Sequence, residues 1–153
     1  MKKIRGKFRP PSNYTSPIDP KIAEHVVDEC CRVFPDRYSN DEAGERFQEL
    51  HAWIYFLARD DRTDAHLIRR ICTLYLDEAD TLEFDNYEDT YWAASDIALC
   101  AFGHPHCPPE ILARACRSKN LYYAECAAEK DRTPVEDKVY VTLYFANVDK
   151  SLR

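Results

Sequence analysis

The feature that most constrains this chain is a register of residues that recurs between residues 54 and 140. A shift of 26 residues places Cys107 on Thr133 and Pro108 on Pro134. A shift of 44 residues places Thr63 on Cys107. The shift of 44 also aligns these pairs: Leu67 with Ile111, Ile68 with Leu112, Arg70 with Arg114, and Cys72 with Cys116. Such recurrence predicts a repeated unit made of a helix, a short polar turn and a second helix. Successive units of the chain would pack against one another.

The run His-Pro-His-Cys-Pro-Pro-Glu-Ile-Leu-Ala-Arg-Ala at residues 104–115 resembles leucine-rich-variant repeats, which are relatives of HEAT-type helical repeats. The resemblance extends over residues 54–140 and is better over 97–140 than over 54–76. It implies helix pairs that stack through a proline-containing turn. It also implies a scaffold that binds other proteins, and it implies no reaction.

Helix start signals divide the chain into segments. They stand at Asp19-Pro20, Ser39 with Glu42, Thr63, and Thr133-Pro134 with Glu136. Gly103 fits the left-handed position that follows a helix end. Residues 138–146 have high β propensity behind a clear helix start, so we expect a helix there and leave a strand open as the alternative.

These signals predict an all-α fold, a compact stack of antiparallel helix pairs with six to seven helices. Only three glycines occur, which argues against a β fold rich in tight hairpins. We expect one helical domain over residues 19–148, preceded by a flexible basic arm over residues 1–18. The predicted core consists of Ile22, Val26, Phe47, Leu50, Ile54, Leu57, Leu67, Ile71, Ala98, Leu99, Leu112, Cys116 and Ala127.

Charge and cysteine content limit the function classes. The arm holds five basic residues and no acid, whereas the rest of the chain has 16 bases and 27 acids. The arm could contact nucleic-acid phosphate, but the acidic body would repel a polyanion, which argues against direct nucleic-acid binding. Seven cysteines, without a signal peptide or an apolar run long enough to cross a membrane, predict free thiols and a cytoplasmic protein.

The acidic connector, residues 77–89, is the best candidate for a binding surface, with seven acids, no base and interleaved aromatics. The residues expected to bind a partner are Asp77, Glu78, Asp80, Glu83, Asp85, Tyr87, Glu88 and Asp89. Such a surface steers a basic partner and offers aromatic anchors. We therefore expect a non-catalytic inhibitor of the immunity-protein or phage anti-defence type, which occludes a toxin nuclease or a nucleic-acid-binding defence complex. The plainer alternative is a solvated loop whose aromatics pack on the core.

A second constellation comprises Cys100, His104, His106 and Cys107, which are residue types that bind zinc. No Cys-x-x-Cys pair accompanies them, and the recurring register explains the cysteines as small buried apolar side chains. We therefore expect no metal and no cofactor. A metal- or thiol-dependent enzyme that uses this region remains the alternative, and a nucleic-acid-associated adaptor is a third. The sequence leaves the partner's identity and the oligomeric state open.

Overall fold

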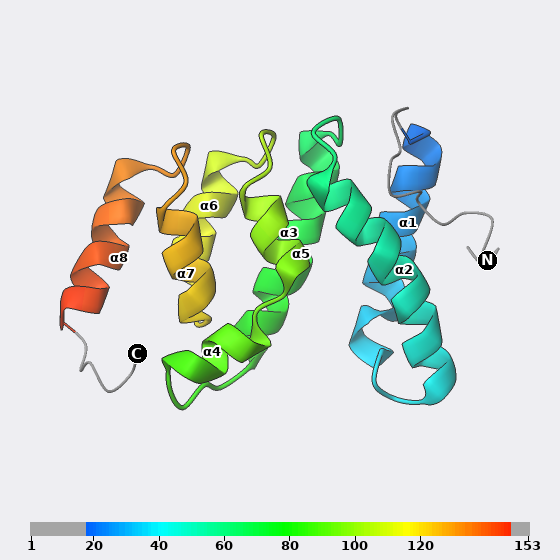
Figure 1. Ribbon diagram of the computed structural model, residues 1–153, viewed down its shortest axis with the longest axis horizontal. Coiled ribbons are helices and arrows are strands. Elements are labelled where there is room, and N and C mark those ends of the chain that lie inside the picture. Colours follow the sequence, from blue (N-terminus) through cyan, green and yellow to red (C-terminus); the bar gives the residue numbers. More distant parts are fainter. Residues whose placement is uncertain (1–17, 148–153) are drawn as a thin grey trace.

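A computed structural model describes residues 18–147, and this part of the chain is helical without strands (Figure 1), as the all-α prediction requires. The helices are α1 (Pro20–Val33), the 3₁₀ helix η2 (Phe34–Asp36), α2 (Asp41–Arg59), α3 (Ala65–Thr81), α4 (Tyr87–Ala93), α5 (Asp96–Phe102), α6 (Pro109–Cys116), α7 (Leu121–Ala128) and α8 (Val135–Asn147). Residues 138–146 therefore belong to a helix. The basic arm lies outside the described residues except for Ile18.

The expected number of six to seven helices is wrong, because the described residues form eight α-helices. The segment from Tyr91 to Phe102 divides between α4 and α5. Ser95 causes the break: its hydroxyl accepts from the N–H of Ile97 and caps α5. The backbone N–H of Ser95 donates to the hydroxyl of Tyr123 at 2.8 Å, so it is not available to a continuous helix.

The helices pack in two rows (Figure 1). One row contains α2, α5 and α7, where α5 contacts both of its neighbours, and the other contains α3, α6 and α8, where α6 contacts both. The α1 helix packs on α2 and α3 at one end, and α8 packs on α6 and α7 at the other. The core lies between these helices. Of the predicted core residues, only Ile22 and Leu99 are partly exposed, and both pack against the buried cluster.

Helix ends follow the sequence signals only in part. Asp19 caps α1 and Pro20 begins it, as expected. Asn40, rather than Ser39, caps α2 by accepting from the N–H of Ala43. Gly103 has φ −84°, so the expectation of a left-handed residue there is wrong.

Three turns share one hydrogen-bond pattern: residues 60–64, 104–108 and 130–134. In each, the N–H of the fourth residue donates to the carbonyl of the first, as from Thr63 to Asp60 and from Cys107 to His104. The hydroxyls of Thr63 and Thr133 each donate to a carbonyl six residues earlier, at 2.7 and 2.5 Å. They therefore bind the end of the preceding helix. The sequence had suggested that they cap the following helix, and this expectation is wrong.

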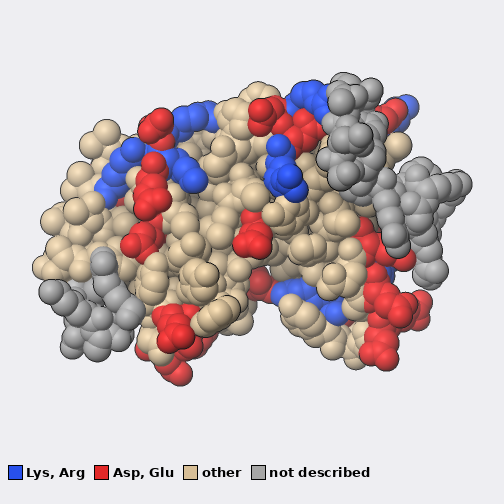
Figure 2. All heavy atoms as spheres, in the orientation of Figure 1, with Lys and Arg blue, Asp and Glu red and all other residues tan. Residues whose placement is uncertain are grey.

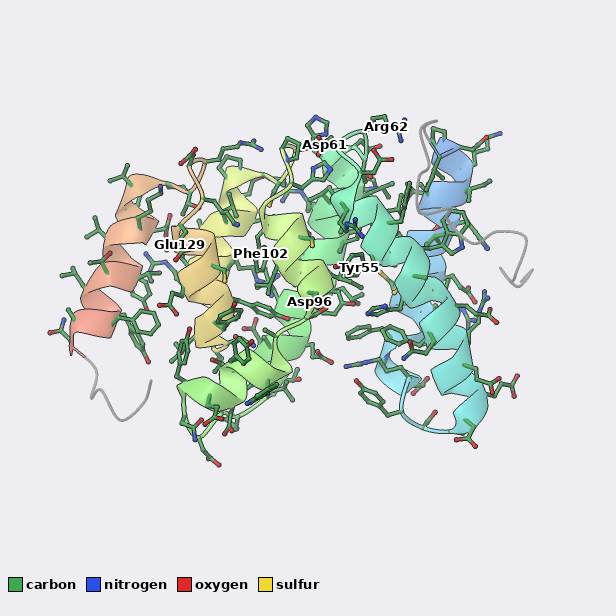
Figure 3. All side chains as sticks on the ribbon, in the orientation of Figure 1. Tyr55, Asp61, Arg62, Asp96, Phe102 and Glu129 are labelled. Atoms are coloured by element: carbon green, nitrogen blue, oxygen red, sulfur yellow. The ribbon has the colours of Figure 1, made fainter. Side chains whose placement is uncertain are left out.

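Side chains of each later turn reach back to the turn before it. The Nε2 atom of His104 donates to the carbonyl of Asp60 at 2.7 Å. The Nδ1 atom of His106 donates to the carbonyl of Thr63 at 2.8 Å. Arg132 donates in the same way to the carbonyl of Pro105. These contacts form a turn ladder along one edge of the molecule, where Figure 3 shows Asp61 and Arg62 at the tip of the first turn.

Candidate functional site

The acidic connector is not a loop over its full length. The α3 helix continues to Thr81, so Asp77, Glu78 and Asp80 lie on its last two turns. Leu76 and Ala79 are buried in the same stretch, and their burial keeps the chain helical there. The prediction of an irregular connector from residue 77 onward is therefore wrong for its first five residues.

Four of the seven connector acids form ion pairs with bases from other segments. Arg114 of α6 binds Asp77 at 2.5 Å and Asp80 at 3.1 Å. Arg37 pairs with Glu78. In addition, Lys119 binds Glu83 at 3.1 Å, between two exposed side chains. Long-range contacts thus bring bases to four acids of a stretch that has no base of its own.

The other three acids surround the start of α4. Asn86 caps this helix by accepting from the N–H of Asp89, and Asp89 accepts from the N–H of Asp85 at 3.3 Å. Within residues 18–147, the carboxylates of Asp85, Glu88 and Asp89 form no ion pair. The helix dipole stabilises negative charges near a helix start, so these carboxylates do not need a basic partner.

Two large aromatic side chains lie beside these acids on α4. Trp92 is 74% exposed and Tyr91 is also exposed, and their rings meet edge to face at 5.2 Å. Glu88 accepts from the indole N–H of Trp92 at 3.4 Å. Tyr91 also packs edge to face on Tyr122 of α7. We name this surface the α4 lobe; it comprises Asp85, Glu88, Asp89, Tyr91 and Trp92.

A second acidic projection lies at the η2–α2 junction. Its exposed residues are Asp36, Tyr38, Asp41 and Glu45, which we name the α2 lobe. Tyr38 is 85% exposed, and the guanidinium of Arg37 lies 4.6 Å from its ring. Figure 2 shows acids gathered at the start of α4 and again at the start of α2, with the molecular edge indented between them.

Tyr87, another residue of the predicted binding set, is only partly exposed. Its hydroxyl donates to the carboxylate of Glu125, and its ring packs on Tyr122 and Phe145. Burial, and then the hydrogen bond to Glu125, raise the pKa of Tyr87 above its usual range. Tyr87 therefore fastens α4 to α7 and supports the α4 lobe from beneath.

A cavity of about 370 Å³ opens between residues 82–87, residues 116–121 and α8. Glu83, Asp85 and Tyr87 from the predicted set line one side of it. Arg117 lines another side, where it binds Asp137 at 3.2 Å and lies 4.0 Å from the ring of Tyr140. No local pattern in the sequence predicts this cavity, since three separate segments of the chain form it.

The Cys-His constellation serves the turn ladder. His104 uses both ring nitrogens: Nε2 donates to Asp60, and Nδ1 accepts from the N–H of His106 at 2.9 Å. Burial lowers the pKa of His104, which favours this neutral form. Among the residues that the structure describes, no three His, Cys, Asp or Glu side chains converge as a metal site would require. The arrangement gives His104 a structural role.

Two thiols of the same region are buried, those of Cys72 on α3 and Cys107 in the second turn. The interaction with Cys107, and then burial, raise the pKa of the Cys72 thiol. Cys72 is therefore buried and protonated, which makes it a poor nucleophile. Cys100, from the end of α5, packs at partial exposure against the core.

Comparisons with known proteins do not add a family or a function, because no family model, curated protein or solved structure matches this chain. No helix in residues 18–147 has the length and apolar character that crossing a bilayer demands.

Proposed function

We propose that this protein is a non-catalytic inhibitor that occludes a basic, nucleic-acid-handling protein through the α4 lobe and the α2 lobe. The single observation that carries the proposal is the exposure of Trp92 among carboxylates that form no ion pair. Exposed tryptophan and tyrosine side chains are the residue types in which binding energy concentrates. The edge-to-face contact with Tyr91 and the hydrogen bond to Glu88 hold the indole in place, which reduces the entropy lost on binding.

The chemistry of the lobes favours a partner rich in arginine and lysine. Carboxylates accept hydrogen bonds from guanidinium groups, and aromatic faces stack on them. A surface that handles nucleic acid carries such residues, as in a toxin nuclease or a defence complex. Immunity proteins and phage anti-defence proteins act by covering surfaces of this kind.

The proposal includes the architecture and the compartment. The shared hydrogen bonds of the three turns support antiparallel helix pairs that stack as leucine-rich-variant or HEAT-like repeats do. Seven cysteines without a disulfide among the described residues fit the reducing cytoplasm.

Capture from the host's lysate, followed by native mass spectrometry, tests this function. We expect a one-to-one complex with a basic protein that weakens as salt is added. Trp92→Ala should weaken this complex by about tenfold or more, as expected for an anchor residue. The neutral triple variant D85N/E88Q/D89N should also weaken it, because it removes charge but keeps side-chain size and the acceptor of Asp89.

The matched control is D61N/E129Q/D131N, which removes the same number of exposed acids from outside the two lobes; Figure 3 labels Asp61 and Glu129. It should bind as the wild type does. An acidic partner would contradict the proposal, and so would capture that is equal for the wild type and both triple variants.

A further inference from the structure

The cavity between residues 82–87, residues 116–121 and α8 has the size and the lining of a binding site. Its volume of about 370 Å³ falls within the range of small-ligand sites in proteins, roughly 300 to 1,000 Å³. Five aromatic side chains line it, from α8 and from the chain around the start of α4: Phe84, Tyr87, Tyr140, Tyr144 and Phe145. Aromatic rings offer apolar contact area, and their faces also attract cations.

The charges at this cavity are not balanced. Within the described part of the chain, the charged side chains of its lining are Glu83, Asp85, Arg117 and Lys119. Arg117 is paired with the buried carboxylate of Asp137 at 3.2 Å, and Lys119 is paired with Glu83 at 3.1 Å. Asp85 has no basic partner in residues 18–147. These five side chains together carry a net charge of one negative unit, which favours a cation as the ligand.

One side of the cavity already binds a guanidinium group of the chain itself. The guanidinium of Arg117 lies 4.0 Å from the centre of the Tyr140 ring, and its Nε donates to the carboxylate of Asp137 at 3.2 Å. Another side offers the same two kinds of group, the carboxylate of Asp85 and an aromatic ring, that of Tyr87. A planar guanidinium suits such groups better than an ammonium does, because it stacks on rings and is more weakly hydrated.

We infer that this cavity receives an arginine side chain of the basic partner, with its guanidinium beside the carboxylate of Asp85. The inference rests on the proposed function and deepens it, since it specifies which side chain the partner contributes. Asp85 belongs both to the α4 lobe and to the lining of the cavity, so the two surfaces are continuous. Arginine is also one of the residue types in which binding energy concentrates at interfaces.

An NMR titration of the full chain tests the cavity without the partner. The probe is N-acetyl-arginine amide, and its matched control is N-acetyl-citrulline amide, which has a similar shape but an uncharged urea group. We expect the arginine compound to shift the ring signals of Tyr140 and Tyr144. We also expect it to bind about fivefold more tightly than the citrulline compound, which is the range of a partly exposed ion pair.

Asp85→Asn should lower the affinity for the arginine compound about fivefold and leave that for the citrulline compound unchanged. Asp85 is exposed, and the substitution keeps the backbone N–H that donates to Asp89, so circular dichroism should show an unchanged fold. The matched control variant is Asp61→Asn, at an exposed acid of the first turn, which should bind both compounds as the wild type does.

Two results would overturn the inference: equal affinity for the two compounds, or shifts at Tyr140 and Tyr144 no larger than those around Asp61. Either result leaves the proposed function standing, because the titration contains no partner. The absence of a basic protein from the captured complex would instead contradict the proposed function. If a basic partner is captured, Tyr144→Leu should weaken its binding about threefold or more, since this variant removes a ring of the lining but keeps an apolar side chain. Unchanged capture by both Tyr144→Leu and Asp85→Asn would also overturn the inference.

Discussion

Replacing Glu29 by Gln tests how much one buried ion cluster contributes to this fold. Glu29 is 1% exposed, and Arg32 and Arg46 both donate to its carboxylate. The hydrogen bonds from Arg32 and then Arg46 lower the pKa of Glu29 from 4.5 to about 2. Since a tenfold change in a protonation equilibrium is about 1.4 kcal/mol, this pKa corresponds to about 3 kcal/mol in favour of the charged form in the folded state.

The Glu29→Gln variant should therefore have a free energy of unfolding about 2 to 3 kcal/mol below that of the wild type at neutral pH. The pH dependence follows from a pKa that folding lowers. The stabilisation is complete above pH 4.5 and is lost as the pH falls toward about 2, where the folded protein also binds the proton. The difference between the two proteins should shrink over the same range.

Urea unfolding, followed by circular dichroism across this pH range, measures the difference. Asp28→Asn is the matched control, because Asp28 lies next to Glu29 but is exposed in its pair with Arg70. It should cost less than about 1 kcal/mol. A Glu29→Gln variant as stable as the control, or a difference that stays constant down to pH 2, would refute the reasoning.

Three further outcomes are expected. Thr133→Val should lower the free energy of unfolding by about 1 kcal/mol in urea titrations, because the carbonyl of Ala127 loses its hydroxyl donor and keeps only backbone N–H donors; Thr142→Val, at an exposed hydroxyl, should cost less than about 0.5 kcal/mol. Burial lowers the pKa of His104 below 6.5, so the unfolded chain binds a proton more readily and stability falls as the pH drops through 6.5. His104→Ala should reduce this fall in thermal melts, and an unchanged slope would contradict the assignment. Trp92→Ala should change the free energy of unfolding by less than about 0.5 kcal/mol, so a large loss would show that Trp92 supports the fold.

Local signals in the sequence predicted the helices well, because they depend on residues close in the chain. Pro20 marks the start of α1, and the apolar spacing through Phe47 and Ile54 marks the buried stripe of α2. The recurring register correctly aligned Thr63 with Thr133, since both hydroxyls make the same hydrogen bond. The predicted role of these hydroxyls was wrong. A threonine hydroxyl can donate to a carbonyl of the preceding helix as readily as it can accept from an N–H of the following one.

The candidate site was less predictable, because it depends on contacts between distant segments. Arg114 neutralises Asp77 and Asp80 from 34 or more residues away, which no local pattern reveals. The sequence did single out the acids of α4, but it could not separate the exposed Trp92 from the enclosed Tyr87. Both are aromatic residues among acids, and only the packing of α7 and α8 distinguishes them.

The turn ladder gives the molecule a direction of growth. In each step an earlier turn presents only backbone carbonyls, and a later turn supplies the side chain that binds them, as His104 does to Asp60. A newly made chain leaves the ribosome in the same order, so each turn can form before its donor exists. A new unit could thus be added after the third turn by providing one donor, without any change in the residues that precede it.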